Sequence, residues 1–370
     1  MEFTVSKVEL VRELALSQGV VEKKTTIPVL SNVLIEARDD EITLTATDLE
    51  LGVRCSCPAA VKKPGASTLP SRKLLDYVRL LPDVDLSVKI GETHAATITC
   101  GRSRTRLAGM SRENFPELAK APAPVAQLPA ALLSGLIGKT SFAISTEGSR
   151  YTLNGALFLL KPDSVTMVAT DGHRLAFVET PFQVEGMSGQ LRALVPKKAL
   201  AEINRLAAEA GENAQVVICN DENHLFFQFG KRLLLTRKLT GQFPDYERVL
   251  PKENDQVVSI NRVELEAALM RVAQFADERS HAIRVAVAPG ELKLGASGSE
   301  SGESEETLPA EGASTALQIG FNAFYLLDFV RAIGAEQVQL ELKDEQSAGQ
   351  LRPGGDVDYQ YRYVVMPMRI

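Results

Sequence analysis

The 370-residue sequence lacks the features of a membrane or secreted protein. No apolar run is long enough to cross a bilayer, and the first residues have no basic region followed by an apolar segment. Only four cysteines are present, Cys55, Cys57, Cys100 and Cys219, which fits a reducing cytosol better than a disulfide framework. Cys55 and Cys57 lack the spacing of a zinc or redox motif, so we expect no metal there and interpret them as buried or half-buried strand cysteines. The cysteine usage and the lack of a secretory signal together predict a cytoplasmic protein.

An excess of positive charge is also missing. The chain has 41 Lys and Arg against 47 Asp and Glu, which gives a net charge of −6. Because DNA-binding proteins are usually basic, the global charge argues against nucleic acid as a partner. Any hypothesis of DNA binding therefore requires a local positive surface.

Three short patterns recur along the chain at spacings between 123 and 128 residues. A length of 370 residues by itself suggests two or three domains. Since three unrelated patterns share one spacing, we predict three domains of similar size, at residues 1–124, 125–252 and 253–370. The patterns lie at residues 46–51, 169–175 and, more loosely, 296–300; at 70–75, 196–200 and 321–327; and at 115–118, 243–246 and 364–368.

Each predicted domain contains two units in which a helix is followed by several strands. Apolar residues at helical spacing alternate along the chain with segments such as 42–47, where apolar residues and threonines alternate as in a strand. We therefore predict an α+β fold in which antiparallel sheets carry helices on one side. The six predicted helices are residues 6–17, 71–81, 129–143, 197–209, 261–275 and 322–333.

The charge is unevenly divided between these helices and the rest of the chain. The six helical segments contain 12 basic and 8 acidic residues, so they carry +4 while the remainder carries −10. Such a protein could hold DNA on its helical side only. Ordinary solvent-exposed helix faces would carry a similar excess of basic residues, and the charge by itself favours this alternative over DNA binding.

The geometry of a ring distinguishes one chain from two. Six helices spaced about 10 Å apart would enclose a hole of roughly 9 Å, which excludes duplex DNA about 20 Å wide. Twelve helices from two chains would enclose a hole of roughly 28 Å. A ring around DNA therefore requires a head-to-tail dimer, in which a half-circle unit closes after two copies.

The motifs, in their order, resemble the beta sliding clamp family, the processivity subunits of bacterial replicative DNA polymerase. The resemblance covers essentially the whole chain and implies a non-catalytic ring dimer without a cofactor, encircling duplex DNA without sequence preference. It also implies that a replicative polymerase catalytic subunit, a clamp loader, repair polymerases and mismatch-repair proteins bind through short apolar peptides. Its most specific stretches are Thr-Asp-Leu-Glu at 47–50, Gly-Arg-Ser-Arg at 101–104, Leu-Asn-Gly at 153–155, Ala-Thr-Asp-Gly-His-Arg-Leu at 169–175, Phe-Pro-Asp-Tyr at 243–246, Arg-Val-Leu-Pro at 248–251 and Tyr-Val-Val-Met-Pro-Met-Arg at 363–369.

The family binds its partners in an apolar cleft between the second and third domains. Methionines adapt to varied ligands, and a concave apolar site accepts short hydrophobic anchors. The alternative for residues 366–368 is a plain terminal core strand. Carried over by motif, the cleft is lined by Leu153, Thr170, Gly172, His173, Arg174, Leu175, Pro244, Arg248, Val249, Val364, Met366, Pro367 and Met368.

The resemblance also implies DNA contacts and a dimer interface between the first domain and the partner's third. Where relatives carry aromatic residues this chain has Thr105 and Thr152, so parts of both surfaces differ from the family pattern. Residues 352–358 carry few structure signals and are predicted to form an exposed loop. The DNA contacts are Lys24, Arg150, Tyr151, Lys197 and Lys198; the interface comprises Lys73, Arg102, Arg104 and Leu107 on one side, and Phe275, Glu303, Glu305 and Glu306 on the other.

Two other functions are compatible with parts of the sequence. A hydrolase or transferase could use Asp171 and His173, but that reading needs a nucleophile or metal partner, which the sequence does not supply. A monomeric repeat scaffold would bind peptides in the same cleft without closing a ring. Oligomer size and retention on circular DNA separate these alternatives.

Overall fold

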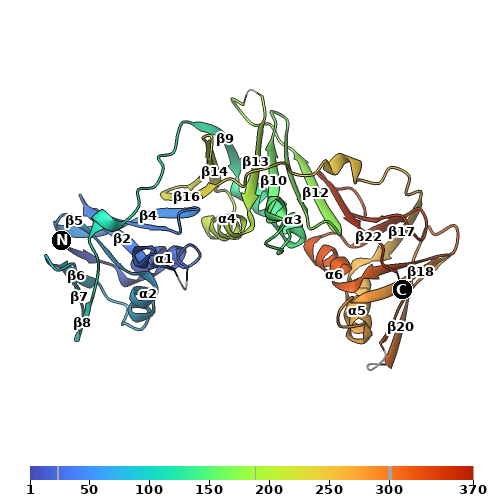
Figure 1. Ribbon diagram of the computed structural model, residues 1–370, viewed down its shortest axis with the longest axis horizontal. Coiled ribbons are helices and arrows are strands. Elements are labelled where there is room, and N and C mark those ends of the chain that lie inside the picture. The colour runs from blue at the N-terminus through green and yellow to red at the C-terminus, as the bar shows by residue number, and fades with distance from the viewer. Residues whose placement is uncertain (23–24, 188, 299–301, 370) are drawn as a thin grey trace. The chain divides into compact units, whose positions relative to one another are not determined.

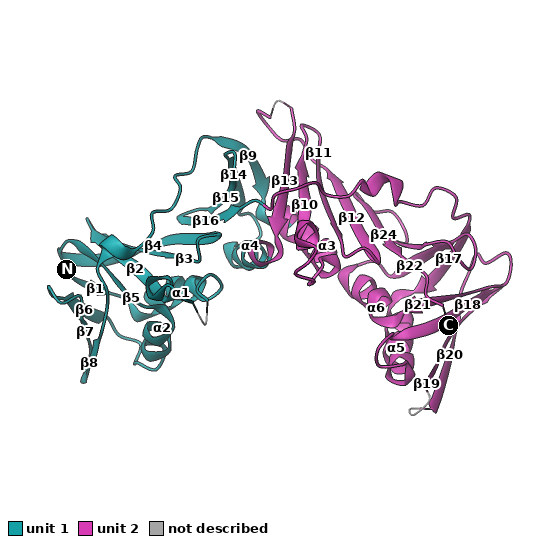
Figure 2. Cartoon of the chain, viewed as in Figure 1, with its two compact units in different colours: residues 1–131, 201–238 teal, residues 132–200, 239–370 magenta. Residues whose placement is uncertain are grey.

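The structure is a computed structural model that describes residues 1–22, 25–187, 189–298 and 302–369. Within these ranges the chain forms six α-helices and 24 β-strands (Figure 1). The residues group into two compact units (Figure 2). Unit 1 contains Met1–Ala131 and Ala201–Lys238, and unit 2 contains Leu132–Leu200 and Leu239–Ile370.

Unit 1 contains one sheet of 12 strands, and its strand pairs are antiparallel. Nine strands lie in the order β8-β7-β6-β1-β4-β16-β15-β14-β9, and β2, β3 and β5 join this path beside β4. Helices α1 and α2 pack against each other and against strands β2 to β5. The bounds are β1 (Glu2–Val5), α1 (Lys7–Ser17), β2 (Asn32–Arg38), β3 (Glu41–Thr47), β4 (Leu51–Lys63), β5 (Gly65–Pro70), α2 (Ser71–Arg79), β6 (Leu86–Ile90), β7 (Ala96–Cys100), β8 (Ser103–Leu107), β9 (Pro124–Pro129), β14 (Gln215–Asn220), β15 (His224–Phe229) and β16 (Arg232–Arg237).

Unit 2 contains a sheet of eight strands and a sheet of four. The larger has the order β13-β10-β11-β12-β24-β23-β22-β17, and the smaller has the order β20-β19-β18-β21. Helices α5 and α6 pack against each other, and α5 covers β19 and β20. The bounds are β10 (Gly155–Leu160), β11 (Ser164–Thr170), β12 (Arg174–Pro181), β13 (Leu191–Pro196), β17 (Gln256–Asn261), α5 (Arg262–Val272), β18 (Ala282–Ala288), β19 (Glu291–Gly298), β20 (Gly302–Pro309), β21 (Leu317–Asn322), α6 (Ala323–Ala332), β22 (Gln337–Leu342), β23 (Gly349–Pro353) and β24 (Gln360–Val365).

All six predicted helices are present, including α3 (Ala130–Thr140) and α4 (Lys197–Ala210). Two of the predicted segments, 129–143 and 261–275, end in short 3-10 helices at Ser141–Ala143 and Ala273–Phe275, and α2 ends at Arg79, two residues before the predicted end. Asparagine side chains cap two of the helices. Asn261 accepts from the N–H groups of Val263 and Glu264 in α5, and Asn322 accepts from those of Phe324 and Tyr325 in α6. These side chains satisfy amide groups that have no partner within the helix.

The two compact units do not follow the three repeats, because sheets continue from one repeat into the next. Strand β4 pairs with β16 through Gly52 and Leu235, and β12 pairs with β24 through Leu175 and Val364. The first pairing attaches strands β14 to β16 of the second repeat to the sheet of the first. Hydrogen bonds between strands therefore tie neighbouring repeats together.

Two local predictions can be compared directly with the structure. Cys55 and Cys57 are buried in β4, as predicted for strand cysteines, and burial raises the pKa of Cys57 to about 12. Cys100 and Cys219 are buried and free as well. The prediction of an exposed loop over residues 352–358 was wrong at its start. Arg352 and Pro353 belong to β23, where they pair with Gln339 and Val338 of β22, and Pro353 is buried. The segment 355–358 is exposed.

The described residues were also searched for a membrane-spanning helix and for a metal site. No helix among them is both long and apolar enough to cross a membrane. The same residues contain no group of three or more His, Cys, Asp and Glu side chains that could hold a metal ion.

Candidate functional site

The turn between β11 and β12 is built by the motif at residues 170–174. The Thr170 hydroxyl donates to the Arg174 carbonyl oxygen at 2.6 Å and accepts from the Gly172 N–H at 3.1 Å. The Asp171 carboxylate accepts from the N–H groups of His173 and Arg174 at 2.9 and 3.1 Å. Gly172 has a φ of +93°, which glycine adopts without steric cost.

The first copy of the motif forms the same turn in unit 1. Thr47 donates to the carbonyl oxygen of Leu51 at 2.9 Å, and Asp48 accepts from the N–H groups of Glu50 and Leu51. Leu49, in the place of Gly172, has a φ of +81°, a conformation that a leucine rarely adopts. The sequence repeat therefore corresponds to a structural repeat. Residues 299 and 300 of the looser third copy lie outside the described residues.

The side chain of Arg174, the last residue of the turn, is held by partners from several elements. Its guanidinium donates to Asp171 at 3.0 Å, to Asp328 of α6 at 2.6 Å and to the carbonyl oxygen of Phe142 at 2.6 Å. It also lies over the ring of Tyr325, 4.2 Å from the centroid. Burial alone would lower the pKa of Arg174, but Tyr363, Asp328 and Asp171 raise it overall, so the side chain stays charged.

This geometry leaves Asp171 no role as a catalytic base. Its carboxylate is engaged by two backbone N–H groups and by Arg174. His173 is exposed on the outside of the turn. The pair therefore forms a structural turn, and the hydrolase alternative has no support in this arrangement.

The end of the chain lies against the same turn. Strand β24 pairs with β12, and beyond it the N–H of Met366 donates to the carbonyl oxygen of His173 at 2.9 Å. The N–H of Met368 donates to the carbonyl oxygen of Gly320 at 2.8 Å. Val364 is buried, whereas 41% of the Met366 surface is exposed. The alternative of a terminal core strand for residues 366–368 is therefore wrong, because β24 ends at Val365 and Met366 is exposed.

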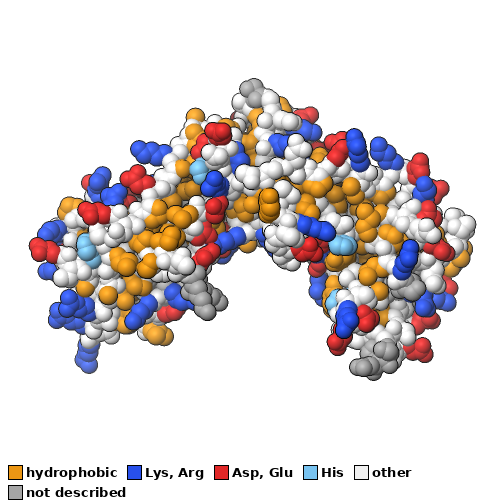
Figure 3. Space-filling view, in the orientation of Figure 1, with side chains coloured by type: hydrophobic (Ala, Val, Ile, Leu, Met, Phe, Trp, Pro, Cys, Tyr) orange, Lys and Arg blue, Asp and Glu red, His pale blue; other side chains and the backbone are white. Residues whose placement is uncertain are grey.

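An apolar cluster in unit 2 joins the predicted cleft residues that come from distant parts of the sequence. Leu153, Leu175 and Val364 belong to it, and Val249 packs against it. Figure 3 shows hydrophobic side chains gathered on the surface over this β12–β24 part of unit 2. Pro244 and Arg248 are exposed, and Arg248 pairs with Asp245 at 2.8 Å.

Several residues at this site were missed by the sequence reasoning. Phe243, Tyr246 and Leu250 belong to the apolar cluster, and Tyr246 stacks on Phe177 with centroids 5.8 Å apart. The repeated Phe-Pro pattern could have indicated the first two. Asp328 gave no signal, because its approach to the turn depends on how the strands pair.

The predicted DNA-contact residues lie at two places in the described structure. Arg150 is tied to the turn, since it donates to the carbonyl oxygen of Asp171 at 3.1 Å and pairs with Glu147 at 3.4 Å. Tyr151 next to it is 63% exposed. Lys197 and Lys198 are exposed at the start of α4. Lys24 lies outside the described residues.

The predicted interface residues lie mainly on the outermost strands of two sheets. In the described residues, β8 ends the 12-stranded sheet and β20 ends the four-stranded sheet. Their charges are opposite: Arg104 of β8 is exposed, as is Glu305 of β20. Arg271 already binds the Glu306 carboxylate through two hydrogen bonds of 2.7 Å. Arg102, Lys73 and Glu303 are exposed, Leu107 is largely buried, and Phe275 is partly buried.

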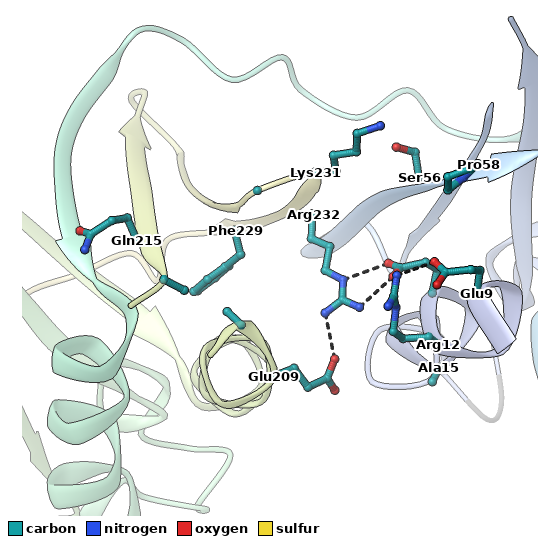
Figure 4. A pocket seen from close by; sticks show the side chains of 14 residues that line it. Glu9, Arg12, Ala15, Ser56, Pro58, Glu209, Gln215, Phe229, Lys231 and Arg232 are labelled. Carbon is teal, nitrogen blue, oxygen red and sulfur yellow. Dashed lines mark hydrogen bonds and ion pairs between the residues drawn. The ribbon is translucent and has the colours of Figure 1, made fainter. Parts of the chain in front are cut away.

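A separate hollow of about 1030 Å³ lies in unit 1 among α1, β4, α4, β14 and the β15–β16 hairpin (Figure 4). One of its lining residues is Glu13, whose carboxylate is 3% exposed and accepts from Arg232 at 2.8 and 3.0 Å and from Arg12 at 2.9 Å. Arg232 also pairs with Glu209 at 2.9 Å. Burial raises the pKa of Glu13, but hydrogen bonds from Arg232 and Arg12 outweigh it and lower the pKa overall. The charges are satisfied within the chain, so the network stabilises unit 1 rather than marking a ligand site.

These features define the class of the protein. The chain repeats one arrangement of helices and antiparallel sheets, and its candidate site joins an adaptable apolar surface to a structural turn. Such a site suits the binding of other proteins rather than a chemical reaction. The comparisons with known proteins agree with this class and give the family.

Three family models of the DNA polymerase III beta subunit match the chain. The N-terminal domain matches residues 1–119, the central domain 127–245 and the C-terminal domain 247–369. The chain is 36% identical to the beta sliding clamp of Pseudomonas putida over the whole of both proteins. It is 35% identical to that of Chlamydia muridarum, covering all of this chain and 99% of the relative.

Solved structures give the same result. A sliding clamp from Pseudomonas aeruginosa bound to griselimycin matches the whole of both chains with a TM-score of 0.94 and 36% identity. The clamp of Caulobacter crescentus matches with a TM-score of 0.93 and 34% identity, covering all of this chain and 99% of the relative. The chain therefore belongs to the DNA polymerase III beta subunit family, the beta sliding clamps, which bind DNA and polymerase. It is a non-catalytic processivity factor, and the α+β fold of three clamp domains predicted from the sequence is confirmed.

Proposed function

We propose that two copies of the chain close head to tail into a ring around duplex DNA, in the cytoplasm. The observation that carries the proposal is the pair of outermost strands with opposite charge. Strand β8 has exposed arginines at positions 104 and 106, and β20 has exposed glutamates at 303 and 305. An unpaired strand edge is a template for pairing with another chain, and opposite charges fix the partner and its register.

The interface follows from this pairing of edges. Lys73, Arg102, Arg104 and Leu107 of one copy would face Phe275, Glu303, Glu305 and Glu306 of the other. Because the two sides are different surfaces, the contact is heterologous and closes after two copies only if each copy turns by half a circle. The domain boundaries that we propose for each half are 1–124, 125–252 and 253–370.

We further propose that the site at the turn and tail of unit 2 binds short apolar peptides of partner proteins. A leucine or phenylalanine anchor would bury itself against the apolar cluster, contributing roughly 1.5–3 kcal/mol for each anchor. Two anchors would support micromolar affinity after the cost of ordering the peptide. The lining residues are Leu153, Thr170, Gly172, His173, Arg174, Leu175, Pro244, Arg248, Val249, Val364, Met366, Pro367 and Met368.

We propose that several partner proteins bind this site one at a time. They are the replicative polymerase catalytic subunit, the clamp loader, repair polymerases and mismatch-repair proteins. DNA would be held without base preference, through phosphates and water, by Lys24, Arg150, Tyr151, Lys197 and Lys198. Arg150 also touches the turn of the peptide site, so its substitution affects both proposed surfaces.

Two measurements on the wild-type chain test this function. Light scattering at micromolar concentration should give twice the mass of one chain. Titration with a fluorescent peptide that carries leucine and phenylalanine anchors should saturate at one peptide per chain. A stable monomer contradicts the ring, and the absence of saturable binding contradicts the peptide site.

A further inference from the structure

We propose that Asp328 of α6 is a positioning residue for the peptide site. It would act through Arg174, keeping the turn at residues 171–174 in the form that receives a partner. The inference rests on the peptide site proposed above and deepens it. It gives a specific task to a carboxylate that the sequence motifs do not include.

The contacts of Arg174 divide its guanidinium among in-chain partners. Nη1 donates to Asp328 at 2.6 Å, Nε donates to Asp171 at 3.0 Å, and Nη2 donates to the carbonyl oxygen of Phe142 at 2.6 Å. The ring of Tyr325 covers one face of the group. Only 10% of the Arg174 side chain is exposed, so little of it remains for a ligand. Its side chain therefore serves mainly to hold the turn at residues 171–174 in place.

Of the two carboxylates that pair with Arg174, Asp328 is the closer, at 2.6 Å against 3.0 Å for Asp171. Charge-assisted hydrogen bonds are about twice as strong as neutral ones, and both partners here are at least half removed from solvent. Without the Asp328 charge, Asp171 would be the remaining carboxylate on the guanidinium. Asp171 also accepts from two N–H groups of the turn, so any shift of Arg174 towards it competes with those bonds.

The same turn carries the tail of the chain. The carbonyl oxygen of His173, inside the turn, accepts from the N–H of Met366, and Arg174 itself pairs with Val365 in the sheet. A displaced turn would therefore also displace Met366. Tyr325 and Asp328 lie three residues apart on α6, so one face of this helix holds both the ring and the carboxylate against Arg174. Helix α6 thus positions both the turn at residues 171–174 and Met366, which is bonded to that turn.

The test compares Asp328→Asn with the wild-type chain. Binding of the fluorescent peptide with leucine and phenylalanine anchors should weaken about tenfold, because a charge-assisted bond becomes a neutral one. Asp328→Glu, which keeps the charge, should recover part of the affinity. The matched control is Glu266→Gln on α5, which neutralises the carboxylate that pairs with Arg331 of α6 at 3.0 Å and with Arg262 at 3.5 Å. This substitution should leave peptide binding unchanged.

A second measurement separates positioning from simple destabilisation. Arg174→Lys alone and combined with Asp328→Asn completes a cycle of variants, and the two effects on peptide affinity should be strongly non-additive. Thermal unfolding and dimer mass of Asp328→Asn should stay close to wild type. If wild type binds the peptide and Asp328→Asn binds equally well, or loses affinity only as it loses folded protein, the inference is overturned. If wild type itself fails to bind, the proposed peptide site fails first.

Discussion

The backbone N–H of Met366 donates a hydrogen bond to the carbonyl oxygen of His173, with 2.9 Å between nitrogen and oxygen. One residue belongs to the tail of the chain and the other to a turn in the second repeat. The bond places a half-exposed methionine beside an exposed turn, with buried Val364 and Leu175 paired behind them. A flexible apolar side chain on such a rigid base suits a site that accepts different peptide anchors.

Removal of residues 366–370 should abolish binding of the polymerase catalytic subunit and leave the dimer intact. The deletion takes away the exposed methionine wall, whereas the proposed interface uses β8, β20 and residues near them. A pull-down with polymerase and light scattering on this one variant give the two readouts. Polymerase binding that survives the deletion would show that the peptide site lies elsewhere.

The single substitution Met366→Ala should weaken peptide binding about tenfold, since part of one apolar contact is lost. Met270→Ala is a matched control, because Met270 on α5 is also 41% exposed. Isothermal titration with the anchor peptide measures both. Equal effects of the two substitutions would indicate a general loss of stability rather than a lost contact.

Loss of the Glu13 carboxylate should destabilise unit 1. Glu13→Gln leaves the buried part of Arg232 without its main partner, at a cost of about 3–5 kcal/mol in free energy of unfolding. Glu9→Gln removes only a more exposed pair with Arg12 and should cost less than about 0.5 kcal/mol. Urea unfolding followed by circular dichroism compares the two variants, and similar costs would contradict the assigned role of Glu13.

The effect of Glu13 should also depend on pH. Its folded pKa lies below the ordinary value of 4.5, so its ionised form stabilises the native state. That contribution is fully present above pH 4.5 and is lost as the pH falls through the lower folded pKa. The difference in unfolding free energy between wild type and Glu13→Gln should therefore narrow below pH 4.5. A difference that stays constant down to pH 3 would contradict this assignment.

Opposite charge on β8 and β20 predicts a specific pattern of complementation. Arg104→Glu and Glu305→Arg should each weaken the dimer, because each places like charges across both interfaces of a head-to-tail pair. Mixing the two variants should restore it, since every interface of the mixed dimer again joins opposite charges. Analytical ultracentrifugation of each variant and of the mixture measures this. A mixture that stays monomeric under conditions in which wild type is dimeric would contradict the interface.

Contact with DNA through phosphates predicts effects that do not depend on base sequence. Lys197→Glu combined with Lys198→Glu should reduce retention on every DNA sequence to the same degree. The slope of log affinity against log salt should fall by about two units if each lysine meets one phosphate. A change in retention that varies strongly from one DNA sequence to another would contradict this mode of contact.

Local patterns in the sequence predicted local structure well. The Thr-Asp motif specifies its own turn, because the side chains of Thr170 and Asp171 bond to amides within four residues. The helical spacing of apolar residues likewise predicted the six helices, because an amphipathic face is recognisable from the local sequence alone. Pro353 was assigned wrongly to a loop, because a proline at the end of a strand resembles a turn residue until its partner strand is known.

Contacts between repeats could not be predicted in the same way. The approach of Asp328 to Arg174 depends on the pairing of β12 with β24, which joins residues far apart in the sequence. The ion pair of Glu13 with Arg232 depends similarly on the pairing of β4 with β16. Neither pair has a spacing or a motif that marks it, so only the three-dimensional structure reveals them.

Closure of the ring around DNA is tested most directly by changing the topology of the DNA. The protein is loaded by a clamp loader onto a nicked circular plasmid, and a restriction enzyme then cuts the plasmid once, far from any loading site. The protein should stay on the circle through gel filtration and leave after the cut, whereas linear DNA with ends blocked by bound protein should retain it. Equal retention on circular and open linear DNA would contradict encirclement.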